Sequence, residues 1–138
     1  MANGGVVYAT RKFTFSSAHR YWQSAWSAEE NARVFGHLTV VHGHNYVLDV
    51  TVAGPVDPAT GMVMDLGELK RLVGDTVVAR FDHADLNADA VFASGAIPTT
   101  ENLVRAIWDL LVPKLGAERL HRLRLWEDST FYVEYFGS

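Results

Sequence analysis

The order of its periodic segments is the feature that most constrains the fold of this chain. Residues 6–19 alternate with a period of two, and residues 42–53 are rich in the valine, tyrosine and threonine that strands favour. Two helical patterns follow, and residues 120–127 and 130–136 alternate again around a turn at Asp128-Ser129. This order predicts an α+β domain with an antiparallel sheet and helices on one face.

Capping and turn residues set the expected ends of the two helices. Asp65 is the expected N-cap of the first, with Glu68 three residues on as in a capping box. Its apolar stripe is Leu66, Leu69, Val73, Val77 and Phe81. The second begins near Thr99 or Thr100, and Pro113 is expected to end it. Its stripe is Leu103, Ile107, Leu110 and Leu111. Residues 21–36 are expected to form a long loop with one helical turn from Ser27.

Composition narrows the classes of protein to which the chain can belong. Its 138 residues fit a single domain, 1–138, and 49% of them are hydrophobic, which is enough for a core. A net charge of −4 argues against nucleic acid and anionic membranes as partners, but not against a small anionic ligand. Neither a signal peptide nor an apolar run of about 20 residues is evident, so we expect a cytoplasmic protein. Without cysteine there is no disulfide, thiolate ligand or cysteine nucleophile.

Three histidines form a candidate zinc site. His42 and His44 are two residues apart on an expected strand, so both imidazoles point to one face. His19 ends the preceding strand, which can pair with this one. Three imidazoles with one open position are a standard arrangement for catalytic zinc. The tripeptide alone is a weak signal, because two partly exposed strand histidines and one unrelated histidine would look the same.

Several ordered motifs strengthen this interpretation through a family resemblance. They are FSSAHR, SAEENARVFG followed by HGHNY, DPATGMVMDLGELK, FDHADLN, PTTENL and a final WED. Together they resemble the 6-pyruvoyltetrahydropterin synthase family, which includes the bacterial 6-carboxytetrahydropterin synthases, over roughly residues 11–136. The resemblance implies the tunnelling fold, with a four-stranded antiparallel sheet and two helices. Trimers of this fold close into a twelve-stranded barrel and stack into a homohexamer, which removes exposed sheet edges.

The resemblance also implies a pterin site. Glu127 would be the pterin anchor, because one carboxylate can accept hydrogen bonds from the ring N–H and the exocyclic amine together. A solvated strand glutamate is the alternative. Thr100 and Glu101 match another segment of the family's pocket, although threonine and glutamate at a helix start are also ordinary capping residues.

Asp82 and His83 match the family's proton-transfer pair, which is expected to reach the pocket of a neighbouring subunit. In such a pair the carboxylate orients the imidazole and raises its basicity. The alternative is that both residues merely cap the end of a helix.

The chain departs from the family at its catalytic cysteine. Counting forward from Phe35-Gly36, and counting back from His42, both place Leu38 at that position. Leucine cannot carry a proton, and it is not the glutamate that replaces the cysteine in one branch of the family. His37 has a suitable pKa for a base but faces the other way on a strand, and an exposed loop histidine is the simpler interpretation. His83 could serve as the base instead.

These observations leave two principal functional hypotheses. The first is a zinc-dependent lyase acting on 7,8-dihydroneopterin triphosphate or a relative. The second is a non-catalytic zinc- and pterin-binding protein, which Leu38 favours. A metal-storage or purely structural protein would not need Glu127.

Overall fold

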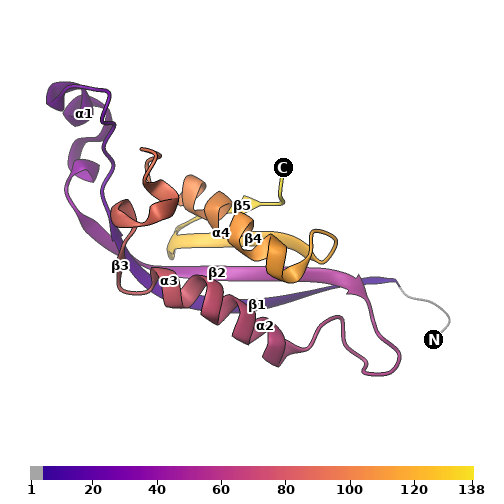
Figure 1. The fold of residues 1–138 in the computed structure, drawn as a ribbon. Coiled ribbons are helices and arrows are strands. Elements are labelled where there is room, and N and C mark those ends of the chain that lie inside the picture. Colours follow the sequence, from indigo (N-terminus) through magenta and orange to yellow (C-terminus); the bar gives the residue numbers. More distant parts are fainter. Residues whose placement is uncertain (1–4) are drawn as a thin grey trace.

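A computed structural model describes residues 5–138 and shows an α+β fold (Figure 1). Two long strands come first, with a short helical arm between them: β1 (Val6–His19), α1 (Ala28–Phe35), the 3₁₀ turn η1 (Gly36–Thr39) and β2 (His42–Pro55). The middle of the chain is mostly helical: α2 (Leu66–Val73), the π-turn η2 (Gly74–Val78), α3 (Ala79–Phe81), β3 (Ala84–Asp85), η3 (Leu86–Ala88) and η4 (Ala90–Phe92). The chain closes with α4 (Thr100–Leu115), β4 (Leu120–Asp128) and β5 (Phe131–Tyr135).

The sheet has the strand order β3-β1-β2-β4-β5. Its four long strands are antiparallel, as predicted, and the β1–β2 ladder runs without a break from Val6–Pro55 to His19–His42. The sequence analysis missed β3, two residues that pair in parallel with Ser17 and Ala18 of β1 and make the sheet mixed. A strand this short shows no periodicity, so only the tertiary contact defines it.

The helices α2, α3 and α4 cover one face of the sheet, and α1 projects away at one end (Figure 1). Side chains alternate along each strand, so every second residue enters the core beneath these helices. Phe15 of β1, Tyr46 and Leu48 of β2, and Leu123 and Leu125 of β4 are all at most 3% exposed. This alternation extends to the histidines at the end of the β1–β2 ladder, which therefore lie on the helix-covered face.

The predicted start of each helix is confirmed by its capping contact. Asp65 Oδ1 accepts a hydrogen bond from the Gly67 N–H at 3.0 Å, and Thr99 Oγ1 accepts one from the Asn102 N–H at 3.1 Å. The arm is more helical than predicted: Ser27 caps eight residues of α1 rather than a single turn.

The prediction that Pro113 ends the second helix was wrong. Pro113 lies inside α4, which continues to Leu115 and is closed by Gly116 at φ 92°. A proline here removes only the hydrogen bond to the Asp109 carbonyl, and Asp109 is exposed, so water can replace it.

The first helix also differs from its prediction, because a π-turn interrupts it at Gly74–Val78. Leu69, Val73, Val77 and Phe81 are fully buried, but Leu66 is 49% exposed at the first turn. Across residues 5–138, no helix is both long enough and apolar enough to cross a membrane.

Candidate metal centre and its surroundings

The strand register brings the three predicted histidines together. His19 pairs directly with His42, and His44 lies opposite Ser17 on the same face. The centroids of the three imidazole rings are 4.6 to 5.1 Å apart. One ring nitrogen from each histidine lies within 4.8 Å of those from the other two. Gly43 suits this close pairing, because a Cβ there would lie 3.2 Å from the Ser17 carbonyl oxygen.

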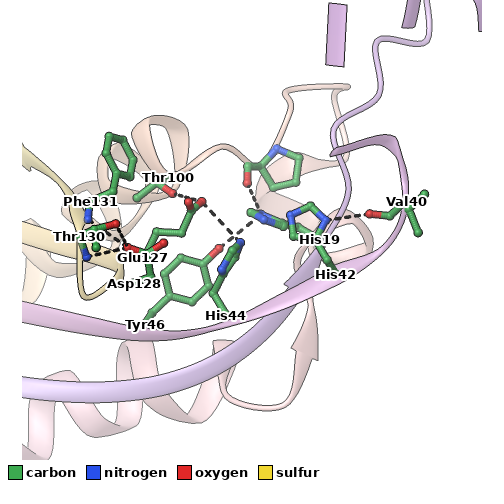
Figure 2. Close-up of polar contacts among 11 residues, drawn as sticks. His19, Val40, His42, His44, Tyr46, Thr100, Glu127, Asp128, Thr130 and Phe131 are labelled. Carbon is green, nitrogen blue, oxygen red and sulfur yellow. Dashed lines mark hydrogen bonds and ion pairs between the residues drawn. The ribbon is translucent and has the colours of Figure 1, made fainter. Parts of the chain in front are cut away.

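Two backbone carbonyls orient the imidazoles (Figure 2). His19 Nδ1 lies 2.8 Å from the Pro98 carbonyl oxygen, and His42 Nδ1 lies 2.7 Å from that of Val40. Because a carbonyl can only accept, each Nδ1 carries the proton and each Nε2 keeps its lone pair. Both Nε2 atoms are buried without a hydrogen-bond partner. Buried polar atoms usually have a partner, and a metal ion would satisfy both nitrogens while the carbonyls hold the rings.

Burial keeps the first of these ligands neutral. His19 is fully buried, and this burial lowers its pKa against the opposing effect of the Pro98 carbonyl. The neighbouring His42 and His44 lower the pKa further. A neutral imidazole is the form that binds a metal. His19 therefore has the charge state and the orientation that a metal ligand requires.

Glu127 and Thr100 lie beside the histidines, as the family resemblance implied. Glu127 Oε1 accepts a hydrogen bond from Thr100 Oγ1 at 2.8 Å and lies 3.7 Å from His44 Nε2 (Figure 2). The Glu127 side chain is 18% exposed, and Thr100 is fully buried. Glu101 is exposed in the first turn of α4. A carboxylate thus faces the histidine group in a position that a ligand can still reach.

The structure does not place Asp82 and His83 with the histidines of the same chain. They follow α3 and bind the edge of β1: Asp82 Oδ1 accepts from the Ser16 N–H at 2.9 Å, and the His83 N–H donates to the Ser16 carbonyl at 2.6 Å. Ser16 and Ser17 point to opposite faces of the sheet. His83 borders an open cavity of about 470 Å³ that Ser16, Ala18, Gly43, His44 and Asn45 help to line.

Asp82 and His83 nevertheless form a pair. Asp82 Oδ2 lies 3.1 Å from His83 Nδ1, and the His83 side chain is 85% exposed at a φ of 60°. The hydrogen bond from the Ser16 N–H is the largest effect that lowers the pKa of Asp82, and the nearby His83 lowers this pKa further. The pair ends a helix, as the capping interpretation held, and it also presents an oriented imidazole to the outside of the subunit.

Neither His37 nor Leu38, the residues at the position of the missing cysteine, offers a ligand atom to the three-histidine group. Leu38 and His37 are exposed residues of η1. His37 lies outside the three-histidine group. The Leu38 carbonyl accepts a hydrogen bond from the Tyr21 N–H at 2.8 Å, which anchors this segment next to Tyr21.

Two tyrosines belong to the site and were missed. Tyr46 is fully buried with its hydroxyl 3.3 Å from His19 Nδ1, and the Tyr21 ring lies 5.2 Å from that of His19. Burial is the main cause that raises the pKa of both phenols, to about 12 for Tyr21. The signal was available for Tyr46, which follows His44 by two residues on β2, the spacing that puts neighbours on one strand face. Tyr21 lies beyond the end of β1 at His19, where strand alternation gives no such signal.

Comparison with known proteins places these residues in a family context. Residues 8–138 match the family model described as 6-pyruvoyl tetrahydropterin synthase. The chain is 38% identical to a 6-pyruvoyl tetrahydrobiopterin synthase of Pongo abelii, covering 99% of this chain and 97% of the relative, and 39% identical to one of Dictyostelium discoideum, covering 96% and 97%. The solved structure of Caenorhabditis elegans 6-pyruvoyl tetrahydropterin synthase superposes with a TM-score of 0.91 at 32% identity, and all of both chains is covered.

Proposed function

This chain belongs to the 6-pyruvoyl tetrahydropterin synthase family, and from that premise we propose that it is a zinc-dependent pterin lyase. Its proposed substrate is 7,8-dihydroneopterin triphosphate or a related dihydropterin. One observation carries the proposal: the unpartnered Nε2 atoms of His19 and His42 lie with His44 in one group, and the carboxylate of Glu127, whose side chain is 18% exposed, lies 3.7 Å from His44.

His19, His42 and His44 would hold the zinc. The set fits this ion, because imidazole is a preferred zinc ligand and two of the rings are already held by carbonyls at their other nitrogen. When bound, zinc would polarise the side-chain hydroxyls of the substrate and acidify the adjacent carbon-bound proton.

Glu127 would fix the pterin ring. An ionised carboxylate only accepts hydrogen bonds, and it would take the ring N–H and the exocyclic amine as a pair. The Thr100 hydroxyl already holds one of its oxygens at 2.8 Å and so restricts the rotation of the carboxylate. Glu101, in the same first turn of α4, would lie at the rim of this pocket.

Asp82 and His83 would transfer protons in the site of a neighbouring subunit. The exposed imidazole, which lies outside the three-histidine group of its own chain, supports this arrangement. A homohexamer built as a dimer of trimers would supply the neighbour. Exposed apolar residues at the start of β1 and around the edge strand β5 support such an assembly: Val6, Val7, Tyr8, Phe131, Tyr132 and Phe136.

Leu38 is expected to slow this lyase, because it stands where the family has a cysteine that acts as the base. General base catalysis typically contributes about 10²–10⁴-fold, so a site without the family's base is expected to be slow. The product would be a 6-pyruvoyl-, 6-carboxy- or 6-hydroxymethyl-type pterin. Leu38 also favours a second candidate, a protein that binds zinc and pterin without converting it.

The decisive experiment measures metal, binding and turnover on one preparation. Zinc-loaded protein is incubated with 7,8-dihydroneopterin triphosphate, and the products are identified by mass spectrometry. A converted side chain supports the lyase. If the protein binds zinc and pterin but forms no product, the non-catalytic binding protein remains as the explanation. If it binds neither zinc nor pterin, both candidate functions are refuted.

A further inference from the structure

Arg20 carries a positive charge that the described part of the chain does not pair. The residue is half-buried, and its Nε atom is buried without a hydrogen-bond partner. No carboxylate among residues 5–138 forms an ion pair with it. Charges removed from water are normally paired, and buried donors normally have an acceptor. An anionic ligand would supply both the opposite charge and the acceptor.

Two neighbours hold Arg20 in one position. The Asn87 side chain binds its backbone twice: Asn87 Oδ1 accepts from the Arg20 N–H at 2.8 Å, and Asn87 Nδ2 donates to the Arg20 carbonyl at 3.0 Å. The guanidinium carbon lies over the Trp22 ring, 4.4 Å from its centroid. This contact holds the cation through the face of the ring and not through a hydrogen-bond acceptor, so the guanidinium donors stay available.

Arg20 lines a cavity of about 230 Å³ between the segment that follows β1 and the loop that precedes α4. Trp22, Ser24, Asn87 and Pro98 are among the other residues of its wall. Pockets for drug-sized ligands usually measure about 300–1,000 Å³, so this smaller cavity suits a compact polar group such as a phosphate.

The charge of this wall distinguishes the cavity from others on the molecule. Arg20 is its only ionisable residue. Three other cavities with an arginine in the wall also contain a carboxylate: Arg105 with Asp109, Arg119 with Glu118, and Arg119 with Asp57, Asp65 and Glu68. The positive charge beside Trp22 is therefore the one that a bound anion would not share with a neighbouring carboxylate of its own cavity.

The cavity adjoins the histidine group through Pro98. This residue lines the cavity, and its carbonyl oxygen lies 2.8 Å from His19 Nδ1. Glu127 approaches a different member of the group, His44, at 3.7 Å (Figure 2). A substrate with its ring on Glu127 and its side-chain hydroxyls at the histidines would carry its phosphates beyond them, and the cavity next to His19 offers a cation there.

We propose, on the basis of the lyase function above, that Arg20 and this cavity bind the triphosphate of the substrate. The guanidinium donates paired hydrogen bonds to phosphate oxygens, the geometry for which arginine is suited. The Ser24 hydroxyl, in the same wall, is a further donor. A chain with a net charge of −4 needs such a local cation to hold a polyanion.

The test compares 7,8-dihydroneopterin with its triphosphate, two probes that share the ring and the side chain and differ only in the phosphates. Binding is followed by stopped-flow fluorescence, before product forms. Arg20→Gln should weaken binding of the triphosphate by roughly 10- to 100-fold and leave dihydroneopterin unchanged. Arg20→Lys should fall between wild type and Arg20→Gln, because it keeps the charge but loses the paired donors. Inorganic phosphate should compete with the triphosphate probe alone.

The matched control is Arg105→Gln, which removes an exposed arginine from a cavity that also holds Asp109. It should leave both affinities unchanged. Zinc content and sedimentation are measured on every variant.

Four results would overturn the inference. They are an unchanged triphosphate affinity in Arg20→Gln, an equal loss for both probes, a wild type that binds both probes equally well, and a change of assembly in Arg20→Gln, which would assign the charge to a carboxylate of a neighbouring subunit. A wild type that binds neither probe would instead overturn the proposed function on which the inference rests.

Discussion

Glu127→Ala tests whether this carboxylate anchors the ligand. The Glu127 side chain is 18% exposed and receives one hydrogen bond in the free protein, from Thr100 Oγ1. A bound pterin would add two charge-assisted hydrogen bonds, worth about 1.5–3 kcal/mol each before allowance for the solvent that reaches the site. Truncating one partner of such a buried pair costs about 2–5 kcal/mol, which is roughly 30- to 5,000-fold in affinity.

The assay for Glu127→Ala is a fluorescence titration with a dihydropterin, together with zinc analysis of the same sample. Zinc content should change little, because Glu127 is not one of the three nitrogen ligands. The matched control is Glu134→Ala, which should leave pterin affinity unchanged. Glu134 is on β5, pairs with Arg124 of β4, and forms ion pairs with Arg122 and Arg124. Equal pterin affinity in wild type and Glu127→Ala would remove the carboxylate from the pocket and refute the reasoning.

Three further predictions concern the metal, the assembly and the missing base. Purified protein should carry about one zinc per subunit, and His42→Ala should strip it while His121→Ala, at an exposed histidine, should not; stoichiometric zinc in a His19/His42/His44 triple variant would contradict the assignment. The protein should sediment as a hexamer at micromolar concentration, and a monodisperse monomer would rule the barrel out. Leu38→Cys should raise triphosphate release from 7,8-dihydroneopterin triphosphate by up to about 10²–10⁴-fold, and His83→Ala in that background should abolish the gain. If Leu38→Cys keeps zinc and binds pterin without any gain, more than the base has been lost.

Local patterns were sufficient to predict much of the fold and the grouping of the three histidines. Alternation along residues 6–19 and the spacing of His42 and His44 predicted one shared face, because successive strand side chains point to opposite sides. Asp65 and Thr99 marked the helix starts through short-range capping contacts. Such signals depend on residues a few positions apart, which a single sequence displays directly.

The family motifs located Glu127 and Thr100, but the contact between them is a tertiary one. These residues are 27 positions apart, and the hydrogen bond that joins them depends on how α4 packs against β4. The resemblance could also name Asp82 and His83. Only the fold showed that they bind the edge of β1 and lie outside the three-histidine group of their own chain.

What the sequence determined by itself was the set of candidate ligands and the order of the elements; what the tertiary structure decided was their environment. The Pro98 carbonyl that orients His19 is 79 residues away along the chain. Pro113 is tolerated on the exposed side of the last turn of α4, and β3 forms only because β1 offers it an edge. Burial, the choice of imidazole tautomer and the polar partners of a side chain depend on which distant segments pack together, and no local periodicity encodes that.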